Sequence, residues 1–578
     1  MTGKNRAYWL KAAYDEMTYI TQMAVFEILP NMPVGRKALP AKWVFSTKKS
    51  RDGKIIKFKA RWVACSDLQK KGVDYHETFA PVANLASVRL MLKKIIRDDL
   101  ELDQSDVIST FLNGDIDTIV FLRQPEGFTI GIGVCILHKS IYGLCQAARI
   151  WYEVVDETLV AIGFRRLFAD QAVWVKIHSD FQCVIGHVDN LLTGGKHARV
   201  DETKAALQER FKLKDLGPAN VFVGLHIVRD RVNRTITLDQ IHYAKEILEL
   251  YSLGDCNAVS VLMQPRTQLL KTVEDEKLPE HEIKLYQAMI GSLGYIMNCT
   301  RPDLAYAVGK VAQFALCPSA QHISAVKYIF RYLKGSLNTI HCIQGKGDSL
   351  VAYFDASWAD DVNDRRSTFS YTVLYGGSAM IWKSKKHKGI SLSTTDAEYL
   401  ATTETTRNIC WIRNIFAEAK LDLPIPVVLR DDNINTNALV SSTSTNNRTR
   451  HIDIKHRFVT EKASEGLIKI EWVTSDDQTA DIFTKPLPRE SLLRHAKSLG
   501  LCFDDPHRCS ICLTAFASNN FLHKHIRTSH PTEGTKTVHS ILLISMITDT
   551  TSDIDNLLIS DEATSDYTST LLIILLHF

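Results

Sequence analysis

Six acidic residues are spaced along the chain as two separate metal-assisted reactions on phosphodiesters would require. In the first half, Asp106 follows a polar–apolar alternation, and Asp189 lies at the tip of a strand–turn–strand pattern. Two carboxylates at strand ends can share Mg²⁺, a hard cation that prefers oxygen ligands, and nucleotidyl transfer by two metals needs such a pair. By spacing alone, each residue also fits an ordinary turn or cap, and that alternative stays open.

A second set of four acids lies in the other half of the chain. They occupy a strand, a helix, a second strand and a late helix: Asp355, Glu398, Asp432 and Asp481. Acids in such places can converge on two Mg²⁺ ions and hydrolyse a phosphodiester with an activated water. Thr395 and Glu398 also have the spacing of a helix capping box, so a purely structural role for Glu398 is the alternative.

A compact cluster near the C-terminal end has the spacing of a tetrahedral zinc site. Its ligands are two cysteines and two histidines: Cys509, Cys512, His525 and His530. Phe516 and Leu522 fall where a ββα zinc finger has its small core, so we predict one bound Zn²⁺. The alternative is an unfolded segment, since about 25 residues cannot fold without the metal. One finger reads about 3 bp, so its target, DNA or a protein, stays open.

Residues 41–64 alternate like strands on both sides of the turn signal Arg51–Gly53, which predicts a hairpin. Between Lys42 and Lys71 lie ten Lys and Arg residues against two acids. Four aromatic residues are interleaved with them: Trp43, Phe45, Phe58 and Trp62. This composition suits a surface that holds phosphates and stacks on bases. A solvated hairpin face is the alternative.

The elements that must position these residues belong to a chain of 578 residues, long enough for about four domains. With 45% hydrophobic and 23% charged residues, the bulk can bury cores. The net charge of +4 restricts any nucleic-acid surface to a local patch. Twelve scattered cysteines do not form a secreted disulfide framework, and neither the start MTGKNRAYWL nor the run LLIILL is a signal or a membrane span. We therefore expect an intracellular protein, in the cytoplasm or nucleus, without a membrane partner.

The secondary-structure pattern changes twice along the chain. Residues 1 to about 250 alternate short β-rich runs with helical patterns, and 251–345 are mostly helical. From Leu350 an α/β pattern follows, with helices expected at about 396–418 and 450–465, and it fades after Pro486. The segment 541–578 has six acids and no Lys or Arg, so we expect it to stay disordered.

Many motifs of the first half resemble, in order, the reverse transcriptase of a copia-type retrotransposon polyprotein. They include KWVF, KARWVA, VDYHETFAPVANLASVRL, DVISTFLNGD, SIYGLCQAARIWY, HVDNLL and TRPDLAYAV, and the resemblance covers residues 7 to about 345. It implies a right-hand polymerase with fingers, palm and thumb, acting on an RNA template and a DNA primer. Asp106 would be the first palm carboxylate, and Phe111 would exclude a ribose 2′-hydroxyl. The remaining implied contacts are Gln146 and Arg149 for the incoming nucleotide and template, and Lys59 and Arg61 for the triphosphate.

Three motifs depart from that family's pattern. The catalytic turn Tyr-Val-Asp-Asp of the family is His187-Val188-Asp189-Asn190 here. Cys145 and Ala148 stand where the family has Lys and Pro, and 65–67 read Cys-Ser-Asp in place of Lys-Gly-Phe. We therefore predict an impaired polymerase.

Residues 350–487, from DASWADDVNDRRST to DDQTADIFTKPL, resemble the RNase H domain that follows reverse transcriptase in copia-type elements. All four acids of the second set match the family's Asp–Glu–Asp–Asp quartet. The implied activity is cutting the RNA strand of an RNA–DNA hybrid with Mg²⁺. A minor departure is that the family's Tyr-His pair appears as His456-Arg457.

Together these patterns predict an α+β multidomain chain. The expected units are 1–250 (reverse transcriptase fingers and palm), 251–345 (thumb or connection), 346–490 (RNase H-like α/β domain), 491–506 (linker), 507–532 (C2H2-type ββα zinc finger) and 533–578 (disordered tail). The predicted function is that of a retrotransposon RNA-directed DNA polymerase and hybrid ribonuclease, with Mg²⁺ and Zn²⁺ as cofactors. The alternative is a non-enzymatic relic, or a domesticated zinc-finger protein that binds nucleic acid or protein.

Overall fold

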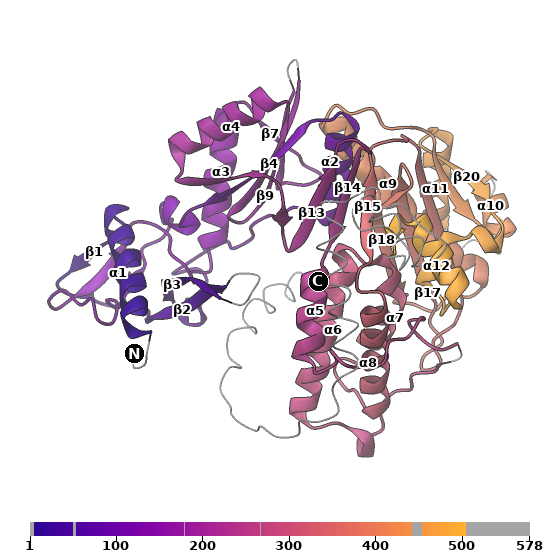
Figure 1. The fold of residues 1–578 in the computed structure, drawn as a ribbon, viewed down its shortest axis with the longest axis horizontal. Coiled ribbons are helices and arrows are strands. Elements are labelled where there is room, and N and C mark those ends of the chain that lie inside the picture. The colour runs from indigo at the N-terminus through magenta and orange to yellow at the C-terminus, as the bar shows by residue number, and fades with distance from the viewer. Residues whose placement is uncertain (1–4, 50–53, 178–179, 266, 442–452, 504–578) are drawn as a thin grey trace, which may run out of the picture.

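The computed structural model describes residues 5–49, 54–177, 180–265, 267–441 and 453–503. The described residues form an α/β structure with five sheets, which runs from a small N-terminal region on the left of Figure 1 to an α/β layer on the right. None of the helices in these ranges is long and apolar enough to cross a lipid bilayer. The predicted zinc ligands and the acidic tail lie outside the described residues.

The N-terminal region consists of one helix packed on a hairpin, beside a small sheet of order β1-β6-β5. Its elements are α1 (Arg6–Gln22), β1 (Phe26–Leu29), β2 (Ala41–Lys49), β3 (Ile55–Ala64), β5 (Phe121–Leu122) and β6 (Val134–Leu137). The predicted hairpin is confirmed, because β2 and β3 pair antiparallel with Trp43 opposite Trp62. Successive side chains of a strand point to opposite faces, so Phe58 and Trp62 share one face of β3 and Lys59 and Arg61 the other.

The aromatic residues of the hairpin are packed within the protein. Phe58 stacks on Tyr8 with ring centroids 5.2 Å apart, and it meets Trp9 edge-on at 4.5 Å. Trp62 is buried, and the indole N–H of Trp43 donates to the carbonyl oxygen of Glu126. Residues of α1 and of the neighbouring loop contact these aromatic side chains, so the rings are not free to stack on bases. Only the basic face of the hairpin remains as a candidate phosphate-binding surface.

The largest sheet is antiparallel throughout, in the order β11-β4-β10-β9-β8-β7. Its strands are β4 (Glu101–Val107), β7 (Arg165–Arg166), β8 (Val173–Ile177), β9 (Phe181–His187), β10 (Asn190–Gly195) and β11 (Leu213–Pro218). The helices of this region are α2 (Leu85–Arg97), α3 (Ala147–Ala161) and α4 (His197–Arg210). Apolar residues of α2 and of β8 to β10 share one core cluster, which fixes the strand ends that carry the first acid pair.

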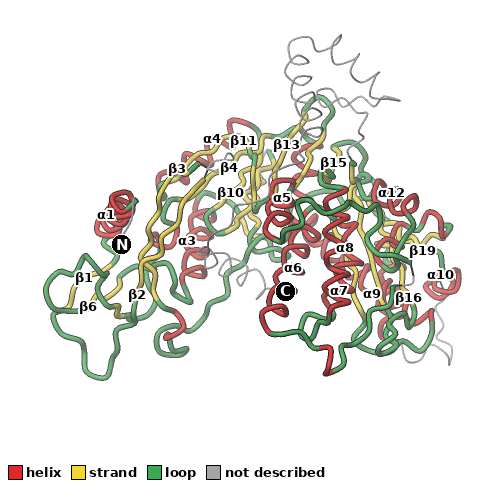
Figure 2. The backbone as a smooth tube through the Cα atoms, turned by 60° about the horizontal axis from the view of Figure 1, so that its bottom comes forward, coloured by secondary structure: helices red, strands yellow, loops and turns green. Residues whose placement is uncertain are grey.

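A middle sheet of order β12-β13-β14-β15-β21 joins this region to the rest. Its strands are β12 (Val221–Phe222), β13 (Leu225–Asp230), β14 (Thr235–Asp239), β15 (Ile340–Gln344) and β21 (Leu501–Cys502). Four helices gather beside it as a bundle (Figure 2): α5 (Ile241–Leu250), α6 (Glu280–Cys299), α7 (Ala305–Ala312) and α8 (Ala320–Gly335). The TRPDL motif is explained here, because Arg301 and Asp303 form a buried ion pair at 2.7 Å that Tyr332 also contacts.

The C-terminal sheet is mixed, in the order β18-β17-β16-β19-β20, with β16, β19 and β20 parallel. Its strands are β16 (Leu350–Ser357), β17 (Thr368–Tyr375), β18 (Ser378–Lys386), β19 (Val427–Asp431) and β20 (Ile468–Trp472). The helices are α9 (Thr394–Glu418), α10 (Ile434–Ser441), α11 (Asp453–Ser464) and α12 (Arg489–Ser498), and the 3₁₀ turn η7 spans Thr479–Phe483. Helix α9 packs on β16 and β17, and α9 and α11 lie where helices were expected, at about 396–418 and 450–465. Strand β18 and helix α10 were not expected.

The segment expected as a linker, 491–506, is more ordered than its sequence pattern indicates. It contains most of α12 and the strand β21, which pairs with β15. Helix α12 is only ten residues long, but it buries Leu492, His495 and Ala496 on one side. Tertiary packing of that short face stabilises the helix, which a local pattern cannot reveal.

Candidate active sites

The first acid pair meets at the edge where β4, β9 and β10 end. Asp106 lies near the end of β4, directly opposite Asn190 on β10, and Asp189 occupies the turn between β9 and β10. The backbone N–H of Val107 donates to the carbonyl oxygen of Asp189 at 2.9 Å, which ties the turn to β4. Burial, followed by repulsion from Asp189, raises the pKa of Asp106. The two acids therefore lie at strand ends as predicted, and the Asp189 carboxylate acts on that of Asp106.

Asn190 is hydrogen-bonded to the acid beside it. Its Nδ2 donates to Asp189 Oδ1 at 3.1 Å, while Gln104 Nε2 donates to Asn190 Oδ1 at 3.0 Å. Gln104 is buried on the same face of β4 as Asp106, two residues away. The amide of Asn190 is thus held in one orientation and occupies a lone pair of Asp189.

The basic face of the hairpin approaches this pair. Lys59 and Asp106 attract each other. The Lys59 ammonium opposes part of the rise in the pKa of Asp106, and the Asp106 carboxylate opposes part of the fall in the pKa of Lys59. Burial is the largest influence on Lys59 and lowers its pKa, with Arg61 next. The Arg61 guanidinium lies 4.4 Å from the centre of the Tyr142 ring, and Phe111 meets the same ring edge-on at 5.2 Å. Lys59 therefore lies near Asp106, and Arg61 and Phe111 share contacts with Tyr142.

Gln146 and Arg149, expected to hold nucleotide and template, have protein partners in this structure. Gln146 is fully buried: its Oε1 accepts a hydrogen bond from Gln69 Nε2 at 3.1 Å, and its Nε2 donates to the carbonyl oxygen of Asp74 at 2.9 Å. Arg149 donates to the carbonyl oxygen of Glu77 and pairs with Glu153 at 2.6 Å. Both side chains therefore hold the segment 69–77, which precedes α2, against the start of α3. Their direct contact with a nucleotide stays a prediction.

The second acid set converges at one end of the C-terminal sheet. Asp355 lies near the end of β16, Glu398 in the second turn of α9 and Asp481 in η7. All three residues are buried, each with 6% of its surface exposed. Thr484 Oγ1 donates to Asp355 Oδ2, and Lys485 Nζ lies 2.8 Å from Asp481 Oδ1.

Mutual repulsion and burial change the acidity of this cluster. Burial, then repulsion from Asp355, raises the pKa of Asp481 to about 7 and raises that of Glu398 well above its usual value. Burial also raises the pKa of Asp355, against the opposing charge of Lys485. A group of acids whose pKa values rise together at one strand end is typical of a functional site.

Glu398 does not cap its helix. The N-cap of α9 is Ser393, whose Oγ accepts a hydrogen bond from the backbone N–H of Asp396. Because α9 begins at Thr394, Glu398 lies one turn inside the helix, and the capping-box interpretation is wrong. Its Oε2 is buried with no hydrogen-bond partner among the described residues, as expected of an acid that awaits a ligand.

The third acid of the quartet has a neighbour that the sequence analysis missed. Strand β19 ends at Asp431, so Asp432 lies one residue beyond it, where Ser475 Oγ donates to its Oδ2 at 2.7 Å. Asp431 is fully buried, and burial raises its pKa to about 8. Strand alternation was the available signal, because Asp431 follows the buried residues Val427 and Leu429 at intervals of two. The cluster therefore contains five acids.

The donor chemistry of this cluster fits a hard divalent cation. Carboxylate oxygens are the ligands Mg²⁺ prefers, and Glu398 Oε2 and the two carboxyl oxygens of Asp431 are buried without a hydrogen-bond partner within the described part of the chain. In that same part, no three His, Cys, Asp or Glu side chains already converge closely enough to hold an ion.

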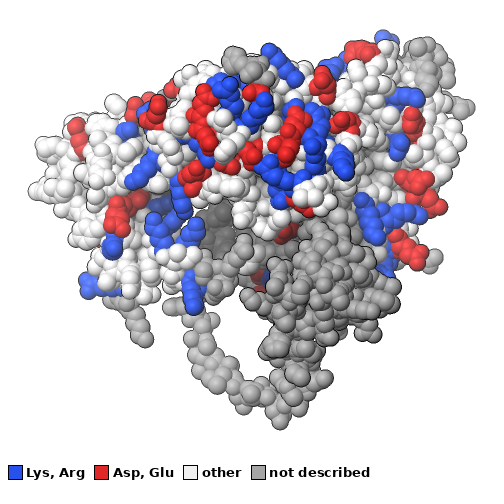
Figure 3. All heavy atoms as spheres, turned by 45° about the horizontal axis from the view of Figure 1, so that its top comes forward, with Lys and Arg blue, Asp and Glu red and all other residues white. Residues whose placement is uncertain are grey.

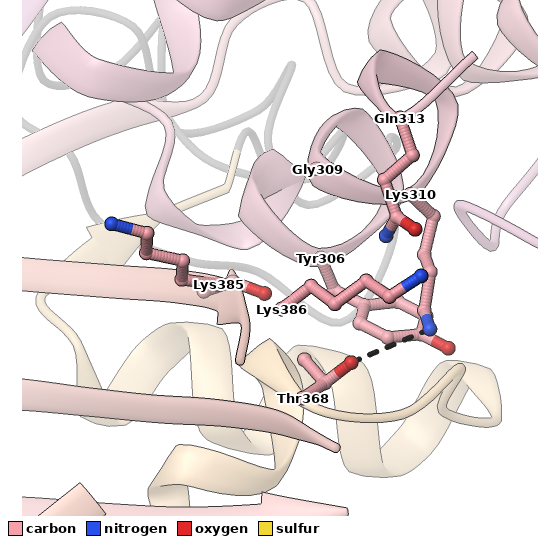
Figure 4. Close-up of a pocket in the computed structure, with 8 residues that line it drawn as sticks. Tyr306, Gly309, Lys310, Gln313, Thr368, Lys385 and Lys386 are labelled. Atoms are coloured by element: carbon pink, nitrogen blue, oxygen red, sulfur yellow. Dashed lines mark hydrogen bonds between the residues drawn. The ribbon is translucent and has the colours of Figure 1, made fainter. Parts of the chain in front are cut away.

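A cavity of about 190 Å³ lies beside the C-terminal sheet, between α7 and the strands β17 and β18. Figure 4 shows Lys310, Lys386 and Thr368 around it. Acids neutralise these lysines, because Lys310 pairs with Asp360 and Lys386 with Asp361 at 2.7 Å. Lys and Arg also alternate with acids over the face shown in Figure 3. Neither feature is a broad basic surface, so the acidic clusters are the better candidates for chemistry.

Known proteins are similar to this chain over most of its length. The family described as reverse transcriptase (RNA-dependent DNA polymerase) matches residues 24–265. A retrovirus-related Pol polyprotein from transposon TNT 1-94 of Nicotiana tabacum is 35% identical over 499 residues, which are 83% of this chain and 37% of that protein. The corresponding polyprotein from transposon RE1 of Arabidopsis thaliana is 32% identical over 85% of this chain and 34% of its own length. The chain thus spans about a third of these relatives.

A shorter relative is covered completely. The putative transposon Ty5-1 protein of Saccharomyces cerevisiae is 31% identical over 313 residues, which are 53% of this chain and 100% of that protein. Among solved structures, an RNase H domain from Mycobacterium tuberculosis covers 26% of this chain with 14% identity and a TM-score of 0.18. An RNase H1 in complex with RNA/DNA hybrid covers 24% with 13% identity and a TM-score of 0.19.

Proposed function

The chain belongs to the copia-type retrotransposon Pol polyproteins, with a reverse transcriptase domain and an RNase H-like fold, and from this premise we propose that it pairs two activities. One is RNA-directed DNA synthesis on a primed RNA template, and the other is hydrolysis of the RNA strand of RNA–DNA hybrids. The observation that carries the proposal is the buried cluster of Asp355, Glu398 and Asp481 beside the end of β19. The test is a pair of assays on one purified sample, primer extension and cleavage of a labelled hybrid.

For the hydrolytic site, we assign Asp355, Glu398, Asp432 and Asp481 as the Mg²⁺ ligands. Bound Mg²⁺ would activate water and stabilise charge on the phosphodiester. Thr484 orients Asp355 through its hydroxyl, and the Lys485 ammonium beside Asp481 offsets part of the negative charge. These two contacts keep buried acids in place before a substrate arrives, which a preorganised site requires.

For the polymerase site, we assign Asp106 and Asp189 as the metal-binding acids of a palm domain formed by the six-stranded sheet. The hairpin β2–β3 would act as the fingers, with Lys59 and Arg61 toward the triphosphate. Arg61 is held over the Tyr142 ring, and Phe111 packs against that same ring. Phe111 is therefore braced where an aromatic side chain could exclude a ribose 2′-hydroxyl.

We infer that Asn190 impairs this polymerase. An aspartate at this position would add a negative charge, whereas Asn190 donates an N–H to Asp189 and so reduces the electron density available to a cation. Metal binding by hard ligands depends on that charge. The same observation supports the second candidate function, a chain that retains the polymerase fold as a relic and binds nucleic acid without extending it.

We also propose a C-terminal zinc finger, whose ligands lie outside the described residues. Full-length protein is expected to bind one Zn²⁺, because two thiolates and two imidazoles match its tetrahedral preference. Cys512→Ser should lose stoichiometric zinc, whereas Cys502→Ser, outside the ligand set, should retain it. Metal analysis of the purified proteins checks both, and a wild-type chain without stoichiometric zinc would contradict the proposal.

The partners that follow from these assignments are an RNA template, a DNA primer and their hybrid, with a DNA or protein contact for the finger. Copying RNA and degrading it in a hybrid are intracellular reactions, so we place the protein in the cytoplasm or nucleus. No membrane contact is part of the proposal.

A further inference from the structure

Helix α2 combines deep burial with three regularly spaced cations. Ten of its 13 residues are buried, and basic residues recur every four positions at Arg89, Lys93 and Arg97. Residues four apart share one face of a helix, which we call the coupling face of α2. The opposite residues, such as Met91 and Ile95, lie in the core that α2 shares with the six-stranded sheet.

Arg89 reaches three backbone carbonyls on two other elements. Its Nη1 donates to the carbonyl oxygen of Met380 in β18 at 2.9 Å, and its Nη2 donates to those of Asn298 and Cys299 at the end of α6. The guanidinium also lies 3.9 Å from the centre of the Trp382 ring. These contacts pair both terminal nitrogens of a buried guanidinium with carbonyl oxygens in place of a carboxylate, while its Nε has no hydrogen-bond partner among the described residues. They join α2 to both the helix bundle and the C-terminal sheet.

Lys93 is fully buried, and its ammonium contacts the segment that leads into the C-terminal sheet. Its Nζ lies 2.6–3.3 Å from four consecutive carbonyl oxygens, those of residues 344–347. Burial lowers the pKa of Lys93 to about 8, with Asp348 opposing that effect. Gly376 packs against this cradle, because a Cβ there would collide with Lys93 Nζ and the carbonyl oxygen of Gly347.

The segment that Lys93 contacts links the reverse transcriptase region to the C-terminal sheet along the chain. Residues 344–347 connect β15 with β16, the strand that carries Asp355. A second contact lies elsewhere, where Trp411 donates to the carbonyl oxygen of Ala169 at 2.9 Å and Glu418 accepts from the N–H of Phe168 at 2.6 Å. The C-terminal sheet and α9 therefore contact the reverse transcriptase region at separate places. These contacts together fix the orientation of the sheet relative to that region.

We propose that Lys93 and Arg89 are positioning residues that hold the hydrolytic site at a fixed offset from the polymerase site, so that a hybrid is cut at a defined distance from the primer terminus. This inference rests on the two proposed activities. The two cations touch neither substrate nor metal in this arrangement. They act through the orientation of β16 and β18, which their carbonyl contacts fix.

The test compares wild type with Lys93→Met and Arg89→Met, which retain much of the side-chain length but lose the charged donors. The matched control is Lys94→Met, the neighbouring lysine, which pairs with Asp98 at the end of α2. Each protein is given an RNA template with an annealed DNA primer, and the RNA cuts are mapped from the primer 3′ terminus. A long hybrid without a recessed primer end reports hydrolysis alone.

Wild type and Lys94→Met should give one narrow group of cuts. Lys93→Met and Arg89→Met should broaden that group at least threefold, while hydrolysis of the long hybrid changes less than twofold. An unchanged cut distribution in either folded variant would overturn the proposal.

Calorimetry separates this inference from the proposed activities. In wild type the reverse transcriptase region and the C-terminal sheet should unfold in one shared transition, and in Lys93→Met in two, whether or not either protein cuts RNA. Absence of cleavage in wild type would therefore refute the ribonuclease, whereas one transition in both proteins would refute the coupling.

Discussion

Asp355→Asn should lower Mg²⁺-dependent cleavage of an RNA–DNA hybrid at least 100-fold, about 2.7 kcal/mol of barrier. The substitution removes the charge of a ligand and almost no volume. Asp355 lies buried among acids that raise one another's pKa, so neutralising it also relieves repulsion in the metal-free protein. The melting temperature without metal should therefore stay the same or rise, which separates loss of chemistry from loss of fold.

The measurement is hydrolysis of a labelled hybrid, together with thermal unfolding at increasing Mg²⁺. A cation that binds only the native state stabilises it, so Mg²⁺ should raise the melting temperature of wild type more than that of Asp355→Asn. The matched control is Asp422→Asn, an exposed acid after α9. Undiminished cleavage by Asp355→Asn, or a folded wild type that never cuts a hybrid, would contradict the ribonuclease assignment.

The sequence predicted the positions of the candidate acids in strands and helices better than it predicted their surroundings. Asp355 and Asp106 were placed at strand ends because strand alternation and turn signals are local. The position of Glu398 was ambiguous, since Thr395 and Ser393 are both acceptable caps and only the helix start decides between them. Asp431 was missed although strand alternation places it on the buried side of β19 with Val427 and Leu429, because alternation alone does not show that this side faces the other acids.

Contacts between distant segments could not be predicted from local patterns. The acceptors of Arg89 and Lys93 are backbone carbonyls about 200 or more residues away, and carbonyls leave no signature in a sequence. The hairpin aromatic residues illustrate the opposite error. Their interleaving with lysines suggested base stacking, but Tyr8 and Trp9 of α1 cover Phe58. Period-two alternation separates the aromatic face from the basic face, and only the basic face remains for phosphates.

The second large effect is expected at the polymerase site, where Asn190→Asp should raise primer extension at least tenfold, about 1.4 kcal/mol of barrier. The substitution replaces an N–H donor toward Asp189 with a carboxylate, which adds a full negative charge beside Asp106. Charge stabilisation in the transition state is a large part of such catalysis. Gln104 Nε2 already donates to the oxygen at this position, so the new carboxylate gains a ready partner.

Template–primer binding should be similar in both proteins, because the basic hairpin face is unchanged, and the gain should appear in the rate of single-nucleotide addition. Asn257→Asp, an exposed amide far along the chain, is the matched control and should leave extension unaltered. Strong wild-type extension that Asn190→Asp does not change would show that the second acid is dispensable. No extension in either protein would instead implicate Cys65, Cys145 and Ala148, and the polymerase fold would then serve as a relic scaffold.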